Sequence, residues 1–552
     1  MKKIKQILQN QKKYLRDLFV ILGIIMFAFL AEHILLQWNS FKNEKFEQTY
    51  SLERADEITN KWGQRTYSFN LDGRYVSSAY LNFQSDTDIE SEISIIYFDG
   101  YGNKEEKIKT MISSDSLPDL ITLSWGDNAI DEMINKDMVY ALNELADEYD
   151  PYFWQVADQE IIKWDTRADG NLYFYPNSAY TSEDYKKYEN IPSNQTFLVR
   201  KDIYESLGCP DMTTQEGFAD AVRRAAKEFK AIDGSELIPI GAHEFTGTGC
   251  VSFDTYLQNF LAVPYEKNGS YNDRYTDEDY VSWLKLFREL GEEGYLKGDI
   301  FIDQRTQMEE KIANGQYFCM LFQRTDLATQ QISLYANHPE QIYMAVEGPR
   351  NHNGDDPRLP GGSINGWTVT MISKNCKDPE KAIQMMSYML SEEGQKVIYL
   401  GVEGVTYDVI DGKPVIKTEV QELKNTDRNT YDEIYGADDT YWMLQDNAMQ
   451  LQWRPEPAPP NGQMEEWTYP YSFNIGPYDI TFQYNSPEAE ADKNIKQLWG
   501  ETLPKLLLAK NEKAFDQIFE EYKQKREELG FQMVMEESTR LMKEAKSRMD
   551  SE

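Results

Sequence analysis

Two apolar runs, residues 93–98 (ISIIYF) and residues 120–125 (LITLSW), decide the fold class of this chain. Each run is short and rich in β-branched and aromatic residues, which is typical of a buried strand. The polar segment 103–111 between them predicts a helix, and the turn-forming run 114–119 (SDSLPD) leads into the second strand. A strand, a helix and a strand in succession form a βαβ unit, so the sequence predicts an α/β fold.

Helix signals continue this alternation toward the C-terminus. Thr213 and Glu216 have the spacing of a capping box, and Phe218 begins an apolar stripe at helical spacing behind them. Asp378 followed by Pro379 is a helix start, because an N-cap aspartate and a proline at the first helical position satisfy the end of a helix. We therefore expect α/β layers over most of the chain.

Length and charge set the broad class. The chain has 552 residues, enough for several domain-sized units. It contains 93 acidic and 57 basic side chains, a net charge of -36. A surface this acidic repels polyphosphate, so the sequence argues against a nucleic-acid partner.

The N-terminus has the opposite charge and a long apolar run. Residues 1–17 are basic, and residues 18–38 are apolar apart from Glu32, His33 and Gln37, long enough for a helix to cross a bilayer. The positive-inside rule predicts a cytoplasmic tail at 1–17, a transmembrane anchor at 18–38 and an extracellular region at 39–552, held at the cell membrane. A cleaved signal peptide is the alternative, although no A-x-A-like cleavage site follows the run.

Several kinds of catalytic site have no local support in the sequence. The four cysteines (Cys209, Cys250, Cys319 and Cys376) form no C-x-x-C pair, which favours buried free thiols, with one disulfide as the alternative. The sequence has no H-E-x-x-H helix, no phosphate-binding loop and no G-x-S-x-G elbow. We therefore predict no metal and no cofactor.

Five segments occur in an order that is more specific than any one of them alone. The segments are 114–120 (SDSLPDL), 169–176 (DGNLYFYP), 198–214 (LVRKDIYESLGCPDMTT), 372–382 (ISKNCKDPEKA) and 391–407 (SEEGQKVIYLGVEGVTY). Together they resemble the family 1 extracellular solute-binding proteins of ABC importers. The resemblance is to the long carbohydrate-type members common in Gram-positive bacteria, and it spans about residues 90–550.

The resemblance implies a fold and a function. It implies a two-lobed, type II clamshell of the periplasmic-binding-protein kind, with a hinge and a cleft that closes on a ligand. Lobe 1 is expected over about 60–178 plus 312–350, and lobe 2 over about 195–310 plus 365–552. The implied partners are a carbohydrate, in particular an oligosaccharide, and the subunits of an ABC permease.

Two features depart from the family's pattern. Many long members carry an acidic calcium loop, but residues 231–237 (AIDGSEL) are too short and too poor in ligands, so we predict no calcium there. No cysteine follows the apolar run that could carry a lipid, and this shifts the expected membrane attachment to the N-terminal helix.

Candidate ligand-binding residues combine aromatic faces with polar groups, because sugars present C–H faces and hydroxyl edges. The candidates lie at predicted strand ends or, for Trp367, at a glycine-rich hinge crossing. For any single aromatic residue, packing in a core is the alternative interpretation. The candidates are Trp125, Asp127, Asn128, Trp367, Tyr175, Arg324 and Asp99.

Two other functions remain open at this point. An extracellular glycan-cleaving enzyme would need only two carboxylates across a glycosidic bond, and carboxylates are abundant. A membrane-tethered sensor would close on a ligand without delivering it. The favoured hypothesis is a binding protein that hands an unmodified oligosaccharide to an ABC permease and is not an enzyme.

Overall fold

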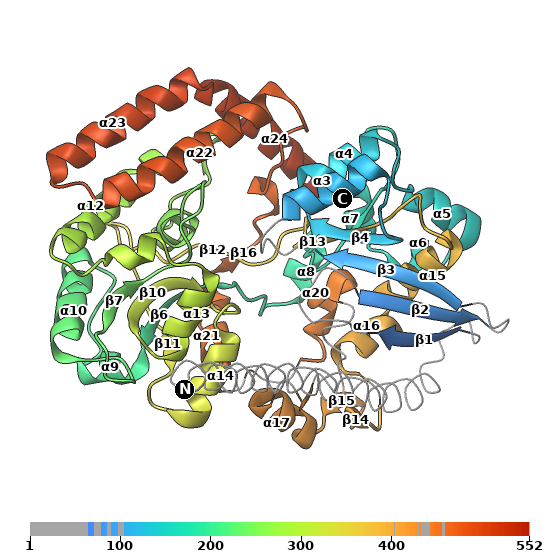
Figure 1. Ribbon diagram of the computed structural model, residues 1–552, viewed down its shortest axis with the longest axis horizontal. Coiled ribbons are helices and arrows are strands. Elements are labelled where there is room, and N and C mark those ends of the chain that lie inside the picture. The colour runs from blue at the N-terminus through green and yellow to red at the C-terminus, as the bar shows by residue number, and fades with distance from the viewer. Residues whose placement is uncertain are drawn as a thin grey trace, which may run out of the picture.

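The computed structural model describes residues 65–70, 79–85, 90–97, 104–401, 403–427, 430–431, 442–454, 457 and 459–550. The predicted cytoplasmic tail, the predicted anchor at 18–38 and Asp99 lie outside these residues. Within the described ranges, no helix has both the length and the apolar character needed to cross a membrane. The described chain forms two α/β lobes that lie side by side (Figure 1).

Lobe 1 is built on a six-stranded sheet with the order β1-β2-β3-β4-β13-β5. Strands β3 and β4 are parallel and are joined through helix α3, which confirms the βαβ unit predicted at residues 93–125. Strand β13 is antiparallel to both of its neighbours. The bounds are β1 Arg65–Asn70, β2 Ala79–Ser85, β3 Glu90–Tyr97, β4 Leu120–Ser124, β5 Tyr175–Pro176, β13 Thr368–Ile372 and α3 Lys104–Ser114.

Helices cover this sheet and bury a continuous core, in which Leu120 and Ile372 from the strands meet Met386 from α15. Asp378 caps α15 as expected, because its side chain accepts a hydrogen bond from the Lys381 N–H at 3.0 Å. The remaining elements of lobe 1 are α4 Asn128–Asn135, α5 Leu142–Tyr149, α6 Phe153–Val156, α7 Gln159–Asp165, α15 Pro379–Leu390, α16 Glu392–Tyr399, β14 Tyr407–Ile410, β15 Lys413–Ile416, α17 Thr418–Thr426, η5 Trp442–Leu444 and α20 Asn447–Gln450.

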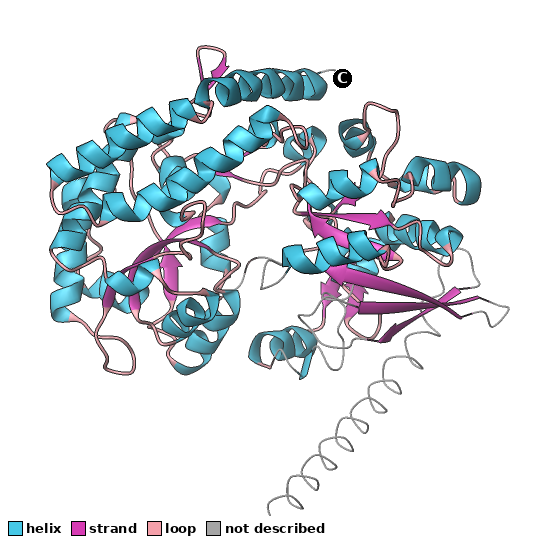
Figure 2. Ribbon diagram, turned by 45° about the horizontal axis from the view of Figure 1, so that its top comes forward, coloured by secondary structure: helices cyan, strands magenta, loops and turns pink. Residues whose placement is uncertain are grey.

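Lobe 2 is built on a four-stranded sheet with the order β11-β6-β10-β7. Strand β10 is parallel to β7 and antiparallel to β6. Figure 2 shows helices packed around this sheet. The bounds are β6 Gln195–Arg200, β7 Ile238–Gly241, β10 Tyr317–Gln323, β11 Tyr343–Ala345, α9 Lys201–Ser206, α10 Gln215–Glu228, η2 Ser252–Tyr256, α11 Leu257–Phe260, β8 Glu266–Lys267, β9 Ser270–Tyr271, η3 Arg274–Thr276, α12 Glu278–Glu292, η4 Gly298–Phe301, α13 Arg305–Ala313 and α14 Ala328–Asn337.

Three C-terminal helices complete lobe 2: α22 (Pro487–Leu507), α23 (Glu512–Glu528) and α24 (Phe531–Asp550). Trp499 of α22 is buried in the lobe 2 core. One predicted cap is wrong by a residue, because Thr214, not Thr213, accepts from the N–H three positions on, at 3.1 Å.

The expected lobe boundaries are wrong in two places. The sequence predicts residues 312–350 in lobe 1, but β10 and β11 both pair with β6 in the sheet of lobe 2. It predicts the region after residue 365 in lobe 2, but β13 inserts between β4 and β5 in lobe 1. A strand belongs to the lobe whose sheet it pairs with. Because the paired strands lie far apart in the sequence, no local pattern indicates which sheet each strand joins.

Over the residues that the structure describes, the chain therefore crosses between the lobes three times. Two of these crossings pair as the short parallel strands β12 (Leu359–Pro360) and β16 (Ser472–Phe473). Tyr185 contacts both crossings, since its hydroxyl oxygen lies 2.9 Å from the Gly362 carbonyl oxygen and 3.3 Å from the Phe473 carbonyl oxygen. A side chain at Gly362 would clash with the ring of Tyr180, whose Cδ2 would lie 1.7 Å from the added Cβ. Other short elements here are α8 Ser182–Lys187, α21 Gly462–Glu466, η6 Tyr469–Tyr471 and η7 Gly476–Tyr478.

All four cysteines are free, and Cys250, Cys319 and Cys376 are buried, as predicted. Cys209 is exposed, which corrects the expectation that all four thiols are buried. It follows Gly208 at the end of α9 with a positive φ of 52°, in a turn at the surface.

Candidate functional site

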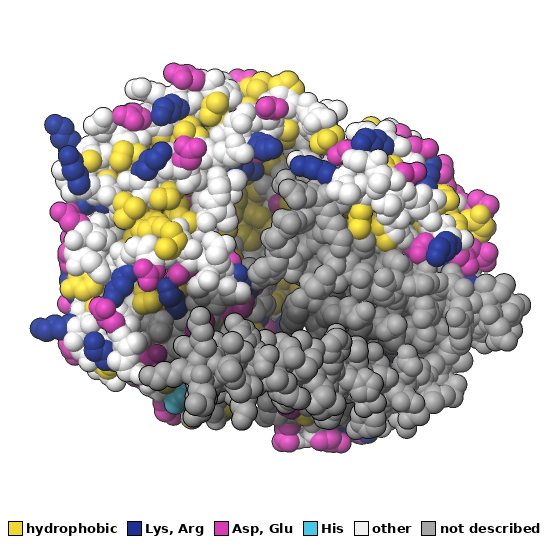
Figure 3. Space-filling view, viewed as in Figure 1, with side chains coloured by type: hydrophobic (Ala, Val, Ile, Leu, Met, Phe, Trp, Pro, Cys, Tyr) yellow, Lys and Arg dark blue, Asp and Glu magenta, His cyan; other side chains and the backbone are white. Residues whose placement is uncertain are grey.

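The candidate site lies at strand ends in the two sheets, beside the segments that cross between the lobes. We call the end of β4 and the start of β13 the lobe 1 edge, and the end of β10 and the start of β6 the lobe 2 edge. In lobe 1, β4 ends at Ser124 beside Thr368, where β13 begins after crossing from lobe 2. In lobe 2, β10 ends at Gln323 beside Gln195, where β6 begins after crossing from lobe 1. Carboxyl ends of strands are where open α/β sheets bind ligands. Figure 3 shows the described surface of lobe 2 on the left and that of lobe 1 at the upper right.

The structure brings Trp125 and Trp367 together at the lobe 1 edge. The Trp125 N–H donates to the Trp367 carbonyl at 3.3 Å, and the Trp367 N–H donates to the Asn177 carbonyl at 3.1 Å. Gly366 has a positive φ of 66°, and a Cβ there would lie 2.0 Å from the Asn177 oxygen. Only glycine permits this close approach, so Gly366 fixes the place from which Trp367 projects.

The two indole rings differ in exposure. Trp367 is 52% exposed. Trp125 is half-buried and packs against the apolar cluster that contains Leu123 and Ile130. An exposed aromatic face at a strand edge offers a stacking surface, and a half-buried one supports its neighbour.

Asp127 and Asn128, also predicted at this edge, begin helix α4. The Asp127 carboxylate accepts from the Ala129 N–H at 2.9 Å and so caps the helix. Asn128 occupies the first helical position and is exposed. Of the two side chains, Asn128 is therefore the more accessible to a ligand at the Trp125 edge.

The structure places Tyr175 in the core of lobe 1. It is 5% exposed, and its ring meets Phe153 edge-on at 6.2 Å. Its hydroxyl accepts from the Asp158 N–H at 2.9 Å, and burial raises the pKa of the phenol. Tyr175 therefore packs in the core, which is the alternative interpretation for any single aromatic residue, and little of its surface is left for a ligand.

Arg324, which follows β10 in lobe 2, contacts Ser193 and Glu465 in segments that cross between the lobes. Its Nε donates to the Ser193 carbonyl at 2.8 Å, and its Nη1 pairs with Glu465 at 2.9 Å. Glu465 also pairs with Arg454 at 2.8 Å. Burial lowers the pKa of the Arg324 guanidinium. The side chain is 12% exposed, so its donors serve the fold in this conformation.

Sequence reasoning missed the polar side chains at the lobe 2 edge. The Asn259 amide donates to the Gln195 side chain at 2.8 Å, and the Tyr256 hydroxyl donates to the Gln323 side chain at 3.1 Å. Asn259 is 1% exposed, and Gln195 is 9% exposed. The run 252–261 (SFDTYLQNFL) holds buried polar residues inside an apolar segment, and this pattern is the signal that could have found them.

His243 supports the same edge. Its ring stacks on Phe322 with centroids 3.9 Å apart, and its Nε2 accepts from the Gln323 N–H at 3.1 Å. Burial lowers the pKa of His243 to about 4, so the ring is neutral at physiological pH. A neutral imidazole can accept this hydrogen bond, whereas an imidazolium cannot.

In residues 231–237, where we predict no calcium, the acidic side chains already contact other groups of the protein. Asp233 accepts from the Ser235 N–H at 2.8 Å, and Glu236 pairs with Lys297 at 2.7 Å. In the part of the chain that the structure describes, no three His, Cys, Asp or Glu side chains gather as a metal site. The absence of calcium at 231–237 remains a prediction.

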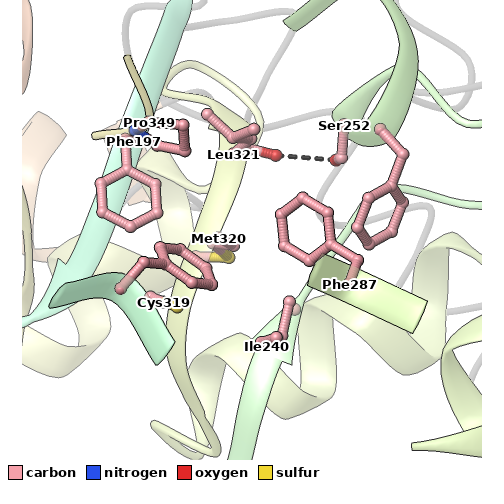
Figure 4. A pocket seen from close by; sticks show the side chains of 11 residues that line it. Phe197, Ile240, Ser252, Phe287, Cys319, Met320, Leu321 and Pro349 are labelled. Atoms are coloured by element: carbon pink, nitrogen blue, oxygen red, sulfur yellow. Dashed lines mark hydrogen bonds between the residues drawn. The ribbon is translucent and has the colours of Figure 1, made fainter. Parts of the chain in front are cut away.

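A small cavity in lobe 2 is not a sugar site. It lies inside the core, with Phe197, Ile240, Phe287 and Leu321 among its lining side chains (Figure 4). The Ser252 hydroxyl there already donates to the Leu321 carbonyl at 2.7 Å. An apolar lining cannot satisfy the hydroxyls of a carbohydrate, so we assign this space to core packing.

Comparison with known proteins places this architecture in a family. The profile of the bacterial extracellular solute-binding protein family matches residues 79–421, and the chain belongs to this family. A curated relative is the polygalacturonan/rhamnogalacturonan-binding protein YtcQ of Bacillus subtilis, 18% identical over 326 residues. The match covers 58% of this chain and 61% of YtcQ, so the chain spans about three fifths of that relative.

Solved structures show the same fold. The alginate-binding protein AlgQ2 aligns with a TM-score of 0.61 at 18% identity, over 80% of this chain and 89% of AlgQ2. The ABC-transporter substrate-binding protein FusA of S. pneumoniae, in complex with kestose, aligns with a TM-score of 0.57 at 15% identity, over 81% of this chain and 91% of FusA. These similarities confirm the predicted two-lobed α/β fold.

Proposed function

We propose that this protein captures an oligosaccharide between its lobes, outside the cytoplasm, and delivers it unmodified to an ABC permease. The observation that carries the proposal is the pair Trp125 and Trp367, which lie side by side at the lobe 1 edge across the hinge from an amide-rich lobe 2 edge. The chain's family and the glycan-binding names of YtcQ and AlgQ2 support it.

The chemistry of the two edges suits a sugar. A half-exposed indole such as Trp367 can stack on the C–H face of a pyranose ring, where water is displaced at little polar cost. Amide side chains donate and accept at once, which matches hydroxyl groups that do the same. Gln323 is an amide at the lobe 2 edge, and in this structure it contacts Tyr256, Thr325 and Asp326, so a sugar there would exchange places with one of these partners. Closure of the lobes would bring both surfaces onto one ligand.

We also propose that residues 18–38 anchor the protein as one membrane-spanning helix with residues 1–17 in the cytoplasm. The basic flank and the missing cleavage site support an uncleaved anchor. The intact mass of the protein purified from membranes tests this: a mass that includes residue 1 or 2 supports the anchor, and a chain that begins near residue 32 contradicts it.

A thermal-shift screen of the full-length protein in detergent tests the main proposal. The panel holds neutral and acidic oligosaccharides, and a ligand of the folded cleft raises the melting temperature by mass action. Calorimetry should then give one site, and chromatography should recover the sugar unchanged. Cleavage of the bound sugar would instead support the glycan-cleaving enzyme, and no shift with any glycan would contradict carbohydrate binding.

A further inference from the structure

Two arginines beside the hinge lack the counterions that other arginines in this acidic chain have. Arg223, Arg288 and Arg305, for example, each pair with a glutamate. Arg274 and Arg358 form no ion pair with any residue that the structure describes, although acids outnumber bases by 93 to 57 in the sequence. Both arginines donate a hydrogen bond to Asn259, and each guanidinium lies over an aromatic ring.

Arg358 is exposed and precedes the hinge strand β12. Its guanidinium lies over the ring of Phe473, 4.6 Å from the centroid, and Phe473 belongs to β16, the partner of β12. Its backbone N–H donates to the Asn259 carbonyl at 2.9 Å. The cation is therefore fixed at the point where the chain leaves the lobe 2 edge for lobe 1.

Arg274 lies behind the same residues and is 7% exposed. Its guanidinium lies over Tyr265, 3.9 Å from the centroid, and its Nη2 donates to the Asn259 side-chain oxygen at 2.5 Å. The ring of Tyr265 is 6.0 Å from that of Phe473. A buried cation without a counterion leaves a positive potential, which is weakly screened because water is excluded.

We propose that Arg358, with Arg274 behind it, binds a carboxylate of the captured sugar, so that the ligand is an acidic oligosaccharide containing uronate residues. This inference rests on the proposed function. The planar fork of a guanidinium matches a carboxylate and can form two parallel hydrogen bonds to it. A chain with a net charge of -36 repels anions at long range, so an acidic ligand requires such a local cation.

The test compares each acid with its neutral ester. Trigalacturonate, trimannuronate and triguluronate are titrated into the full-length wild-type protein, followed by the methyl ester of each. We expect at least one acid to bind about tenfold or more tightly than its ester, since a charge-assisted hydrogen bond contributes that much. Raising the salt concentration should weaken the acid more than the ester.

Arg358→Gln should remove the preference for the acid. Because Arg358 is exposed, this variant should melt at the wild-type temperature, so a loss of affinity will not reflect unfolding. Arg358→Lys keeps the positive charge but lacks the planar guanidinium, so its preference for the acid should lie between those of the wild type and Arg358→Gln. The control is Arg540→Gln on α24, an exposed arginine that pairs with Glu537 at 2.6 Å, and it should keep the wild-type preference.

The remaining outcomes separate this inference from the proposed function. Equal affinity for acid and ester, a preference for neutral or sulfated trisaccharides, or an unchanged preference in Arg358→Gln would overturn the uronate assignment and leave carbohydrate binding intact. Absence of binding by any acidic or neutral glycan would overturn both.

Discussion

The two edges that meet at the hinge are built in different ways. At the lobe 1 edge, backbone hydrogen bonds hold Trp125 and Trp367, and half of the Trp367 side chain remains exposed. At the lobe 2 edge, Gln195 and Asn259 bond to each other and are almost fully buried. The first edge offers surface to a ligand, whereas the second has used most of its donors and acceptors inside the fold.

This difference separates stability from binding. A side chain whose polar groups are satisfied inside the protein contributes to folding, and its removal leaves partners unsatisfied. A side chain that projects into solvent contributes little to folding and keeps its surface for a ligand. We therefore expect substitutions near the lobe 2 edge to lower stability and substitutions of the lobe 1 indoles to lower affinity.

The largest effect is expected for Arg324→Ala. The change leaves the Glu465 carboxylate with one fewer cation and the Ser193 carbonyl without its donor. Glu465 keeps its pair with Arg454, so the loss is that of the charged hydrogen bonds of Arg324, about 2 kcal/mol, and urea unfolding at pH 7 measures it. Wild-type stability together with lost glycan affinity would contradict the structural role and would make Arg324 a ligand contact, as the sequence suggested.

The sequence predicted the elements of the fold because their signals are local. The strands near 93–98 and 120–125 and the helix capped by Asp378 each have a recognisable apolar pattern or cap. Lobe membership after residue 312 could not be predicted in the same way. Strand β10 pairs with β6 across more than a hundred residues, and no short pattern records that choice.

The site was predicted in part for the same reason. A tryptophan at the end of a buried strand is visible in the sequence, and Trp125 lies at such an end. Burial is not visible, so Tyr175 and Arg324 are predicted as candidates, although weaker ones than Trp367, and both lie inside the protein. Partners such as Gln195 and Asn259 lie 64 residues apart, and only the fold brings them together.

A smaller effect at pH 4, one that changes with pH, is expected for Asp254→Asn. Asp254 lies in η2, next to the lobe 2 edge, and is 5% exposed. It accepts from the Trp499 indole N–H at 2.7 Å and from the Cys250 N–H at 2.7 Å, and it has no cation within ion-pair distance among the described residues. Burial raises the pKa of this carboxyl from 3.8 to about 7.

The sign of the pH dependence follows from that shift. The unfolded chain ionises Asp254 near its ordinary pKa of 3.8, while the folded protein keeps it protonated up to about 7. Its contribution to the free energy of unfolding is therefore greatest below pH 4, falls between pH 4 and pH 7, and is constant above pH 7.

Asparagine cannot ionise, so the Asp254→Asn variant should gain stability relative to the wild type as the pH rises from 4 to 7. At pH 4 it should be less stable by about 1 kcal/mol, because one acceptor is lost. Urea unfolding of both proteins at pH 4, 5, 6 and 7 gives the difference directly. A constant difference would show that Asp254 ionises alike in both states, and Asp220→Asn at the exposed end of a surface pair serves as the control.

The smallest effect on the free energy of unfolding is expected at the lobe 1 edge. There, Trp367→Ala and Trp125→Ala should each weaken binding of the glycan found for the wild type by about tenfold, since the stacking surface is lost. The Trp367 variant should unfold within about 0.5 kcal/mol of the wild type, because its indole is half exposed. Tyr335→Ala, at an exposed tyrosine of α14, is the matched control and should bind normally. Calorimetry with one glycan across all four proteins makes the comparison. If both tryptophan variants keep wild-type affinity, the ligand does not stack on this edge, and the search for its contacts moves to the amide side chains of lobe 2.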